Sequence, residues 1–168
     1  MTNEEFIRLH RGEDTSALAL KRAPEGVDLK FCLEQIKSRQ KAERKLPRWA
    51  AVEGLLFPPA LSMEQCSSQE TAHYKQQLVE RILSLEERNV MVDLTAGFGV
   101  DFSYLAMLFK QVVYVEQQAN LCEIAHHNMP LLGLGHAEIR CARCEEYLQE
   151  SGCADLIFMD PADRKSVV

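Results

Sequence analysis

The stretch VMVDLTAGFGVD, residues 90–101, decides the fold of this chain. It opens with apolar residues typical of a strand and runs into a turn that contains Gly97 and Gly99. Glycine lets the backbone turn tightly and lets a ligand approach it without an intervening Cβ. A plain strand-to-helix turn is the simpler interpretation of the same residues. The stretch predicts a strand, a glycine turn and a helix that starts near Asp101.

Apolar runs of strand length recur after this stretch, and segments of helix length separate them. Strands that are apolar throughout and alternate with helices indicate a parallel sheet covered on both faces. Right-handed crossovers make such a sheet doubly wound, so we expect an α/β domain over residues 89–168. The expected strands are VMVDL (90–94), VVYVE (112–116), AEIRC (137–141) and ADLIFMD (154–160), and the expected helices are 101–110, 117–132 and 144–150.

The first half of the chain has a helical period instead, so we expect a helical region over residues 1–88. Asp28 can cap a helix that runs from Leu29 towards Leu46, and Pro47 stops that helix.

A second helix is expected to follow Ser67 and to continue to about Glu87. Ser67 and Glu70 have the spacing of a capping box, in which each side chain bonds the backbone of the other residue. The apolar residues of this helix that we expect to face inward are Leu78, Ile82 and Leu85.

The composition is that of a globular protein with an acidic balance. Of the 168 residues, 46% are apolar and 26% are charged, and the net charge is −6. This charge argues against a surface that binds nucleic acid everywhere, although it allows a local basic patch. The chain has no apolar run of membrane-spanning length, and its acidic N-terminus lacks the apolar segment of a secretory signal. We therefore expect a cytoplasmic protein without a membrane partner.

The six cysteines indicate reduced and mostly buried thiols. Cys141 and Cys144 have the CxxC spacing, but a zinc site needs a second pair of ligands and the sequence offers none. We expect no metal.

The residues directly after each strand carry the chemistry, because ligands of such sheets bind beyond the carboxyl ends of the strands. Asp93 begins the glycine turn and suits a ligand with an ammonium group, which it could hold directly or through water. A dinucleotide fingerprint would place a third glycine where this chain has Phe102, so a pyrophosphate is disfavoured.

Two more acidic residues end strands. Glu116 lies 23 residues beyond Asp93 and can accept hydrogen bonds from both hydroxyls of a ribose. Asp160 precedes Pro161, which stiffens the exit from the fourth strand, and we expect Asp160 beside Gly97 in the crevice. A solvated glutamate and an ordinary Asp-Pro turn are the simpler interpretations.

Together these residues resemble the class I S-adenosylmethionine-dependent methyltransferases. VDLTAGFGVD is similar to their motif I, VVYVEQ to motif II and LIFMDPAD to motif IV, and the resemblance covers roughly residues 88–163. It implies S-adenosyl-L-methionine as the cofactor and a Rossmann-like sheet with strand order 3-2-1-4. A full sheet of this class has seven strands, so we expect a truncated domain whose fourth strand is an exposed edge. Such an edge predicts self-association.

The segments LPRWA (46–50) and LSMEQCSSQETAHYK (61–75) sharpen the resemblance. They are similar to the region before motif I in a bacterial group of RNA methyltransferase-like proteins with a THUMP-like C-terminal domain. This implies methyl transfer to RNA and places Thr71 and Lys75 at the methionine carboxylate. A helix N-terminus near Ser68 would attract that carboxylate, although an ordinary amphipathic helix explains the pattern as well.

Two positions depart from the family pattern. Relatives usually place an acidic residue after the third strand to meet the adenine amino group, whereas this chain has Arg143, which cannot accept a hydrogen bond. The backbone from Ala142 to Cys144 is the substitute. Motif IV ends in Asp163, where enzymes that methylate exocyclic amines usually have an aromatic residue.

The resemblance thus implies the following site. The catalytic residues are Asp160 and Pro161, and the residues that bind the cofactor are Asp93, Thr95, Ala96, Gly97, Gly99, Glu116, Thr71, Lys75, Ala142 and Arg143.

Other interpretations stay open. The chain is either part of an RNA methyltransferase or an inactive cofactor-binding scaffold that lacks the substrate domain, and a nicotinamide-dependent oxidoreductase is a distant third. Trp49 either stacks a base or fills a core. A basic run either contacts phosphates or forms a solvated helix face. Its members are Lys37, Arg39, Lys41, Arg44, Lys45 and Arg48.

Overall fold

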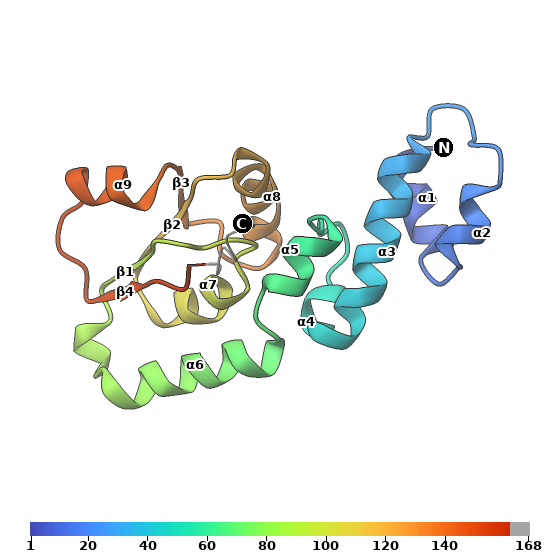
Figure 1. The fold of residues 1–168 in the computed structure, drawn as a ribbon. Coiled ribbons are helices and arrows are strands. Elements are labelled where there is room, and N and C mark those ends of the chain that lie inside the picture. Colours follow the sequence, from blue (N-terminus) through green and yellow to red (C-terminus); the bar gives the residue numbers. More distant parts are fainter. Residues whose placement is uncertain (162–168) are drawn as a thin grey trace, which may run out of the picture. The chain divides into compact units, whose positions relative to one another are not determined.

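The computed structural model describes residues 1–161, apart from the side chains of residues 60 and 61. The chain divides into two compact units, residues 1–64 and 65–168 (Figure 1).

The first unit is helical, as the period of its sequence predicts. Its core contains Phe6, Leu18, Cys32 and Ile36, which α1, α2 and α3 contribute. The Asp28 side chain accepts a hydrogen bond from the Phe31 backbone N–H and so caps α3, which confirms the expected start of this helix. The helices are α1 (Asn3–His10), α2 (Thr15–Ala19), α3 (Leu29–Lys45), α4 (Pro47–Ala50) and α5 (Ala60–Gln65).

The second unit contains a parallel sheet with strand order β3-β2-β1-β4, which confirms the predicted topology (Figure 1). The strands are β1 (Val90–Asp93), β2 (Gln111–Glu116), β3 (Glu138–Cys141) and β4 (Leu156–Phe158). The helices are α6 (Gln69–Ile82), α7 (Val100–Leu105), α8 (Ala119–Leu131) and α9 (Cys144–Glu150), with short 3₁₀ turns η1 (Leu85–Glu87) and η2 (Ala106–Leu108).

Helices cover both faces of the central strands, as the apolar character of those strands requires. On one face Tyr147 and Cys144 of α9 pack against Val92 and Val113. On the other face the ring of Phe102 from α7 meets the ring of Tyr114 edge-on, with centroids 5.5 Å apart. Alternate residues of β1 and β2 therefore pack into two separate apolar layers, one on each face of the sheet. These two strands are the buried centre of the sheet.

Helix α6 differs from its prediction in both its start and its orientation. Its N-cap is Ser68, whose hydroxyl accepts from the Thr71 backbone N–H at 3.2 Å, and Ser67 lies outside the cap. The helix ends at Ile82 and buries Ala72 and Val79.

The side chains that we expected to face inward are exposed, with 44% for Leu78, 62% for Ile82 and 77% for Leu85. Ala72 and Val79 occupy the buried face of α6 instead, because their small side chains let the helix approach α7 closely. Gln76 secures the contact by donating a hydrogen bond to the Tyr104 carbonyl at 2.9 Å. Helix α6 therefore belongs to the unit with the sheet, although the period of the sequence changes only at residue 89.

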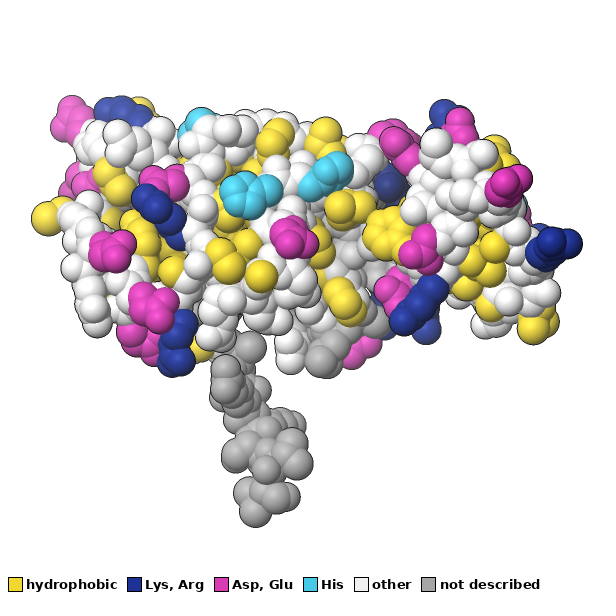
Figure 2. Space-filling model, turned by 90° about the horizontal axis from the view of Figure 1, so that it is seen from above, with side chains coloured by type: hydrophobic (Ala, Val, Ile, Leu, Met, Phe, Trp, Pro, Cys, Tyr) yellow, Lys and Arg dark blue, Asp and Glu magenta, His cyan; other side chains and the backbone are white. Residues whose placement is uncertain are grey.

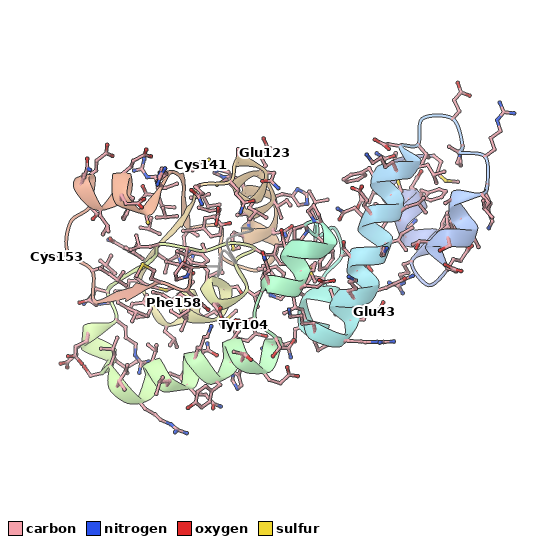
Figure 3. The ribbon with its side chains drawn as sticks, in the orientation of Figure 1. Glu43, Tyr104, Glu123, Cys141, Cys153 and Phe158 are labelled. Carbon is pink, nitrogen blue, oxygen red and sulfur yellow. The ribbon has the colours of Figure 1, made fainter. Side chains whose placement is uncertain are left out.

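All six cysteines are thiols, as expected, but fewer of them are buried than expected. Cys32 and Cys122 are buried, whereas Cys141 and Cys153 are exposed, at the end of β3 and in the loop before β4 (Figure 3). Among the described residues, no three side chains of the metal-ligating types lie close enough together to hold a metal ion. None of the helices in the described part of the chain has the length and apolarity that crossing a membrane requires.

Candidate ligand site at the carboxyl ends of the strands

The turn after β1 is held in place by backbone hydrogen bonds to the neighbouring strand. The Ala96 N–H donates to the Val115 carbonyl at 3.0 Å, and the Gly99 N–H closes the turn onto the Ala96 carbonyl at 2.8 Å. Gly97 and Gly99 have positive φ values of 57° and 86°, which residues with a Cβ rarely adopt. The glycine turn predicted from residues 97 and 99 is therefore confirmed in its geometry.

The two glycines have different surroundings. A Cβ on Gly99 would lie 2.6 Å from the Met129 side chain and 3.3 Å from the Tyr114 ring, so close packing requires this glycine. A Cβ on Gly97 would meet only the Thr95 carbonyl, at 3.8 Å. The backbone at Gly97 is thus open to a ligand, whereas Gly99 is required for the close packing of Met129 and Tyr114.

Asp93 lies under the turn and is almost completely buried, at 1% exposure. Burial raises the pKa of its carboxyl group to about 7, although the hydrogen bond from the Thr95 N–H lowers it. That bond runs from the Thr95 N–H to Asp93 Oδ1 at 3.0 Å. The burial favours the water-mediated alternative of the two contacts that we considered for a ligand ammonium group.

Glu116 ends β2 and reaches across to the glycine turn. Its Oε2 accepts from the Gly97 N–H at 3.0 Å, and its Oε1 accepts from the Gln118 N–H at 2.8 Å. Each carboxylate oxygen keeps a second lone pair for further donors. Tyr114 adds a hydrogen bond from its hydroxyl to the Gly97 carbonyl. Burial raises the pKa of this phenol, so the hydroxyl stays protonated and remains a donor.

Asp160 lies next to the glycine turn, as the expected strand order requires. The Asp160 N–H donates to Thr95 Oγ1 at 2.7 Å, and the Leu94 N–H donates to the Phe158 carbonyl at 2.9 Å. Thr95 thus connects the turn after β1 with the exit of β4. The side chains of Asp160 and the next residue, Pro161, are exposed, whereas Asp163 lies outside the described residues.

Lys75 comes from α6 and contacts two carboxylates. Its Nζ lies 2.9 Å from Asp101 Oδ2 and 3.4 Å from Asp160 Oδ2. Ser67 also donates a hydrogen bond to Asp101 Oδ2, at 2.7 Å. The sequence pointed to Ser67 only as a helix cap and to Asp101 only as the start of a helix, so neither was predicted as a site residue.

The remaining predicted residues lie at the margins of this group. The Ala142 N–H donates to the Glu116 carbonyl at 3.0 Å, which places the start of the loop after β3 beside β2. Arg143 points to the surface, where it forms an exposed ion pair with Glu145. Thr71 is exposed in the first turn of α6. The structure therefore brings together the residues of β1, β2 and β4, and it leaves the Arg143 side chain apart from them.

The chain is similar to a solved structure over nearly its whole length. That structure is described as a "putative methyltransferase" from Porphyromonas gingivalis W83, with a TM-score of 0.80 and 28% sequence identity. The match covers 97% of this chain and 40% of that chain, so the present chain spans less than half the length of this relative.

A second structure shows the fold alone. It is described as a "putative O-methyltransferase" from Klebsiella pneumoniae, with a TM-score of 0.51 and 16% identity, and it covers 93% of this chain and 62% of its own. No protein-family model matches the chain, and the search of curated proteins found no match. The sheet and its helices thus have the Rossmann-like fold of these methyltransferases.

Proposed function

We propose that this chain carries the S-adenosyl-L-methionine-binding part of a methyltransferase. The observation that carries the proposal is the set of carboxylates around one glycine turn: Asp93, Glu116 and Asp160 end three adjacent strands beside Gly97. The likeness to the Porphyromonas gingivalis structure, described as a "putative methyltransferase", supports the same conclusion.

The charges at the strand ends fit this cofactor better than a dinucleotide. A pyrophosphate needs positive groups or free backbone donors, but Lys75 is already bonded to carboxylates and the Gly97 N–H to Glu116. S-adenosyl-L-methionine has a sulfonium and an ammonium group, which carboxylates attract. The open backbone at Gly97 leaves room for close approach of the ligand.

Each residue then has a distinct task. Glu116 accepts the ribose hydroxyls with its remaining lone pairs, and Asp93 receives the ammonium group through water. The backbone at Ala142 faces the adenine in place of an acidic side chain. When bound, the cofactor supplies an electrophilic methyl group, so the protein mainly has to position the nucleophile.

Asp160 and the Pro161 carbonyl are the groups that we propose to orient this nucleophile. The Asp160 side chain is 64% exposed, so its carboxylate is accessible to a ligand. The hydrogen bond from the Asp160 N–H to Thr95 fixes the backbone from which this side chain extends. A carboxylate and a carbonyl both accept hydrogen bonds, which suits an amine with N–H donors.

We further propose RNA as the substrate class, on the resemblance of the segments before β1. Only part of the basic run supports phosphate contacts. Arg39 is buried and donates to the Ala50 and Val52 carbonyls at 2.8 Å each. Lys45 donates to backbone carbonyls near the end of the first unit, and Lys41 pairs with Glu64.

The exposed members of the run are Lys37, Arg44 and Arg48, and their exposure makes them candidates for phosphate contacts. Trp49 belongs to the core, at 3% exposure, so the core-filling alternative is confirmed. On the face drawn in Figure 2, the Lys and Arg side chains of the described residues are dispersed among acidic ones. RNA binding through this chain alone would therefore be weak and sensitive to salt.

Calorimetry with S-adenosylhomocysteine tests the proposed cofactor site. We expect the wild type to bind it and Glu116→Gln to bind at least about tenfold more weakly, because the amide has one acceptor oxygen instead of two. Glu123→Gln, on the exposed side of α8, is the matched control and should bind like the wild type. The absence of binding at millimolar ligand would contradict the proposal, and tighter binding of NAD would favour the oxidoreductase.

Transfer of a labelled methyl group from S-adenosyl-L-methionine to ribosomal RNA tests the substrate class. Label in the nucleosides of digested RNA, and its loss in Asp160→Ala, is the expected result. Label in DNA or protein instead would contradict the RNA proposal.

The second candidate function is a cofactor-binding scaffold without activity. Arg143 favours it, because its side chain turns to the surface where relatives present an acceptor to adenine. Binding of S-adenosylhomocysteine without methyl transfer to RNA, DNA or protein would support this alternative.

A further inference from the structure

Lys75 is the centre of a network that joins four segments of the second unit. Its Nζ donates to Ser67 Oγ at 3.2 Å, to Asp101 Oδ2 at 2.9 Å and to Asp160 Oδ2 at 3.4 Å. The ammonium group also lies 5.0 Å from the centre of the Phe158 ring. Figure 3 shows Phe158 on β4, on the side of the sheet where α7 and α6 lie.

This network uses the whole hydrogen-bonding capacity of the lysine. An ammonium group has three N–H donors, and the three oxygens account for them. The Lys75 and Asp101 side chains are only 23% and 14% exposed, so water screens their attraction less than that of a surface pair. A methionine carboxylate could reach Lys75 only by displacing one of these partners, which argues against the direct role that we expected for it.

The two carboxylates differ in what they face. Asp101 is enclosed between α6 and α7, whereas the Asp160 side chain is 64% exposed beside the glycine turn. Lys75 therefore contacts Asp160 through Oδ2, while Oδ1 of Asp160 remains available to a ligand. Without the lysine, two carboxylates would share this position with no cation between them.

We propose that Lys75 is a positioning residue, which fixes the Asp160 carboxylate and neutralises part of the negative charge that faces the sulfonium end of the cofactor. The inference rests on the proposed function. It assigns Lys75 an action through Asp160 and not a contact with the methionine carboxylate.

A Lys75 that positions Asp160 and a Lys75 that contacts the methionine carboxylate predict different ligand preferences. S-adenosyl-L-methionine carries a positive sulfonium, S-adenosylhomocysteine a neutral thioether, and 5′-methylthioadenosine a thioether without the amino-acid group. Loss of a cation near the sulfonium favours the charged ligand over the neutral one. Loss of a carboxylate contact would weaken the first two ligands equally and spare the third.

Calorimetry with these three ligands tests the proposal in the wild type, Lys75→Met and Lys75→Arg. We expect the ratio of the association constants of S-adenosyl-L-methionine and S-adenosylhomocysteine to rise about fivefold in Lys75→Met. Lys75→Arg retains the charge and should keep the ratio of the wild type. Arg81→Met, an exposed substitution in the last turn of α6, is the matched control and should also leave the ratio unchanged.

The Asp160→Asn background shows whether the effect passes through Asp160. This exposed substitution should lower the ratio by itself, and it should reduce the effect of Lys75→Met to less than about half. The double variant keeps only one of the two carboxylates, so it can be compared with Asp160→Asn even if Lys75→Met alone does not fold. Equal weakening of both amino-acid ligands, or an unchanged effect of Lys75→Met in the Asp160→Asn background, would overturn the proposal.

A measurement without ligand separates this proposal from the proposed function. Urea unfolding of the wild type, both single variants and the double variant gives the coupling between Lys75 and Asp160. We expect a coupling equivalent to about a threefold change in the unfolding equilibrium constant. If the wild type binds none of the ligands, the proposed function fails, and so does the charge effect on the cofactor. In that case, a measured coupling between Lys75 and Asp160 would still support the structural link between the two residues. The absence of a coupling would exclude the structural link as well.

Discussion

At the scale of single residues, Asp93 carries an unusual energetic cost. It is a carboxylic acid with 1% exposure in the layer between β1 and α7, and its partner is a backbone N–H. Because burial disfavours the charged form, the pKa of Asp93 rises from 3.8 to about 7. Folding alone does not require a buried carboxyl group under the glycine turn. Its presence there agrees with a ligand whose binding offsets the free energy lost on burial.

The raised pKa predicts how stability depends on pH. Between pH 4 and 7 the folded protein holds a proton on Asp93 that the unfolded chain has released, so the free energy of unfolding falls as the pH rises. Asp93→Asn keeps an acceptor for the Thr95 N–H and removes the charge. We expect it to stabilise the protein by about 4 kcal/mol at pH 8 and by little at pH 4. Urea unfolding at both pH values measures this, and an equal effect at both would contradict it.

At the scale of elements, the glycine turn is the point where β1, β2 and α8 constrain one another. Gly99 combines a positive φ with two close neighbours, Met129 from α8 and Tyr114 from β2. Tyr114 in turn donates to the Gly97 carbonyl, so the packing of one glycine positions the backbone of the other.

We therefore expect Gly99→Ala to destabilise the protein by about 2 kcal/mol, through backbone strain and the displacement of Met129. Gly152→Ala is the control, because a Cβ there has no atom within 4 Å and the φ of Gly152 is ordinary. Thermal unfolding of the two variants measures the difference. Equal melting temperatures would show that the turn tolerates a side chain.

At the scale of the whole molecule, part of the exposed apolar surface lies on and next to the strand β4. Within the described residues β4 pairs with β1 on one side only, and Ile157 and Met159 are 54% and 61% exposed. A strand edge with apolar side chains pairs readily with another chain.

We propose that the chain self-associates through β4 as its concentration rises. Ile157→Lys should reduce this association, because a charge on the strand opposes edge-to-edge pairing. Gel filtration with light scattering over a range of concentrations measures the change in mass. Met107→Lys, at an equally exposed position of η2, is the control for charge alone. A wild type that remains monomeric throughout would exclude the association.

Much of the site could be predicted because it depends on short-range patterns. The strand ends follow from the change of period, and parallel strands align their carboxyl ends at one edge of a sheet. Asp93, Glu116 and Asp160 therefore had to lie near one another once the strand order was known. Asp101 could not be found in this way, because its partner Lys75 is 26 residues away on a helix whose orientation the sequence does not specify.

The sequence by itself determined the parallel sheet, the glycine turn and the acidic residues that end the strands. These features depend on backbone conformation and on the alternation of apolar segments, which neighbouring residues encode. Only the tertiary structure decided which face of α6 is buried and which carboxylates Lys75 bonds. Those outcomes depend on competition between side chains from distant elements, where the packing of Ala72 and Val79 outweighed the burial of larger residues.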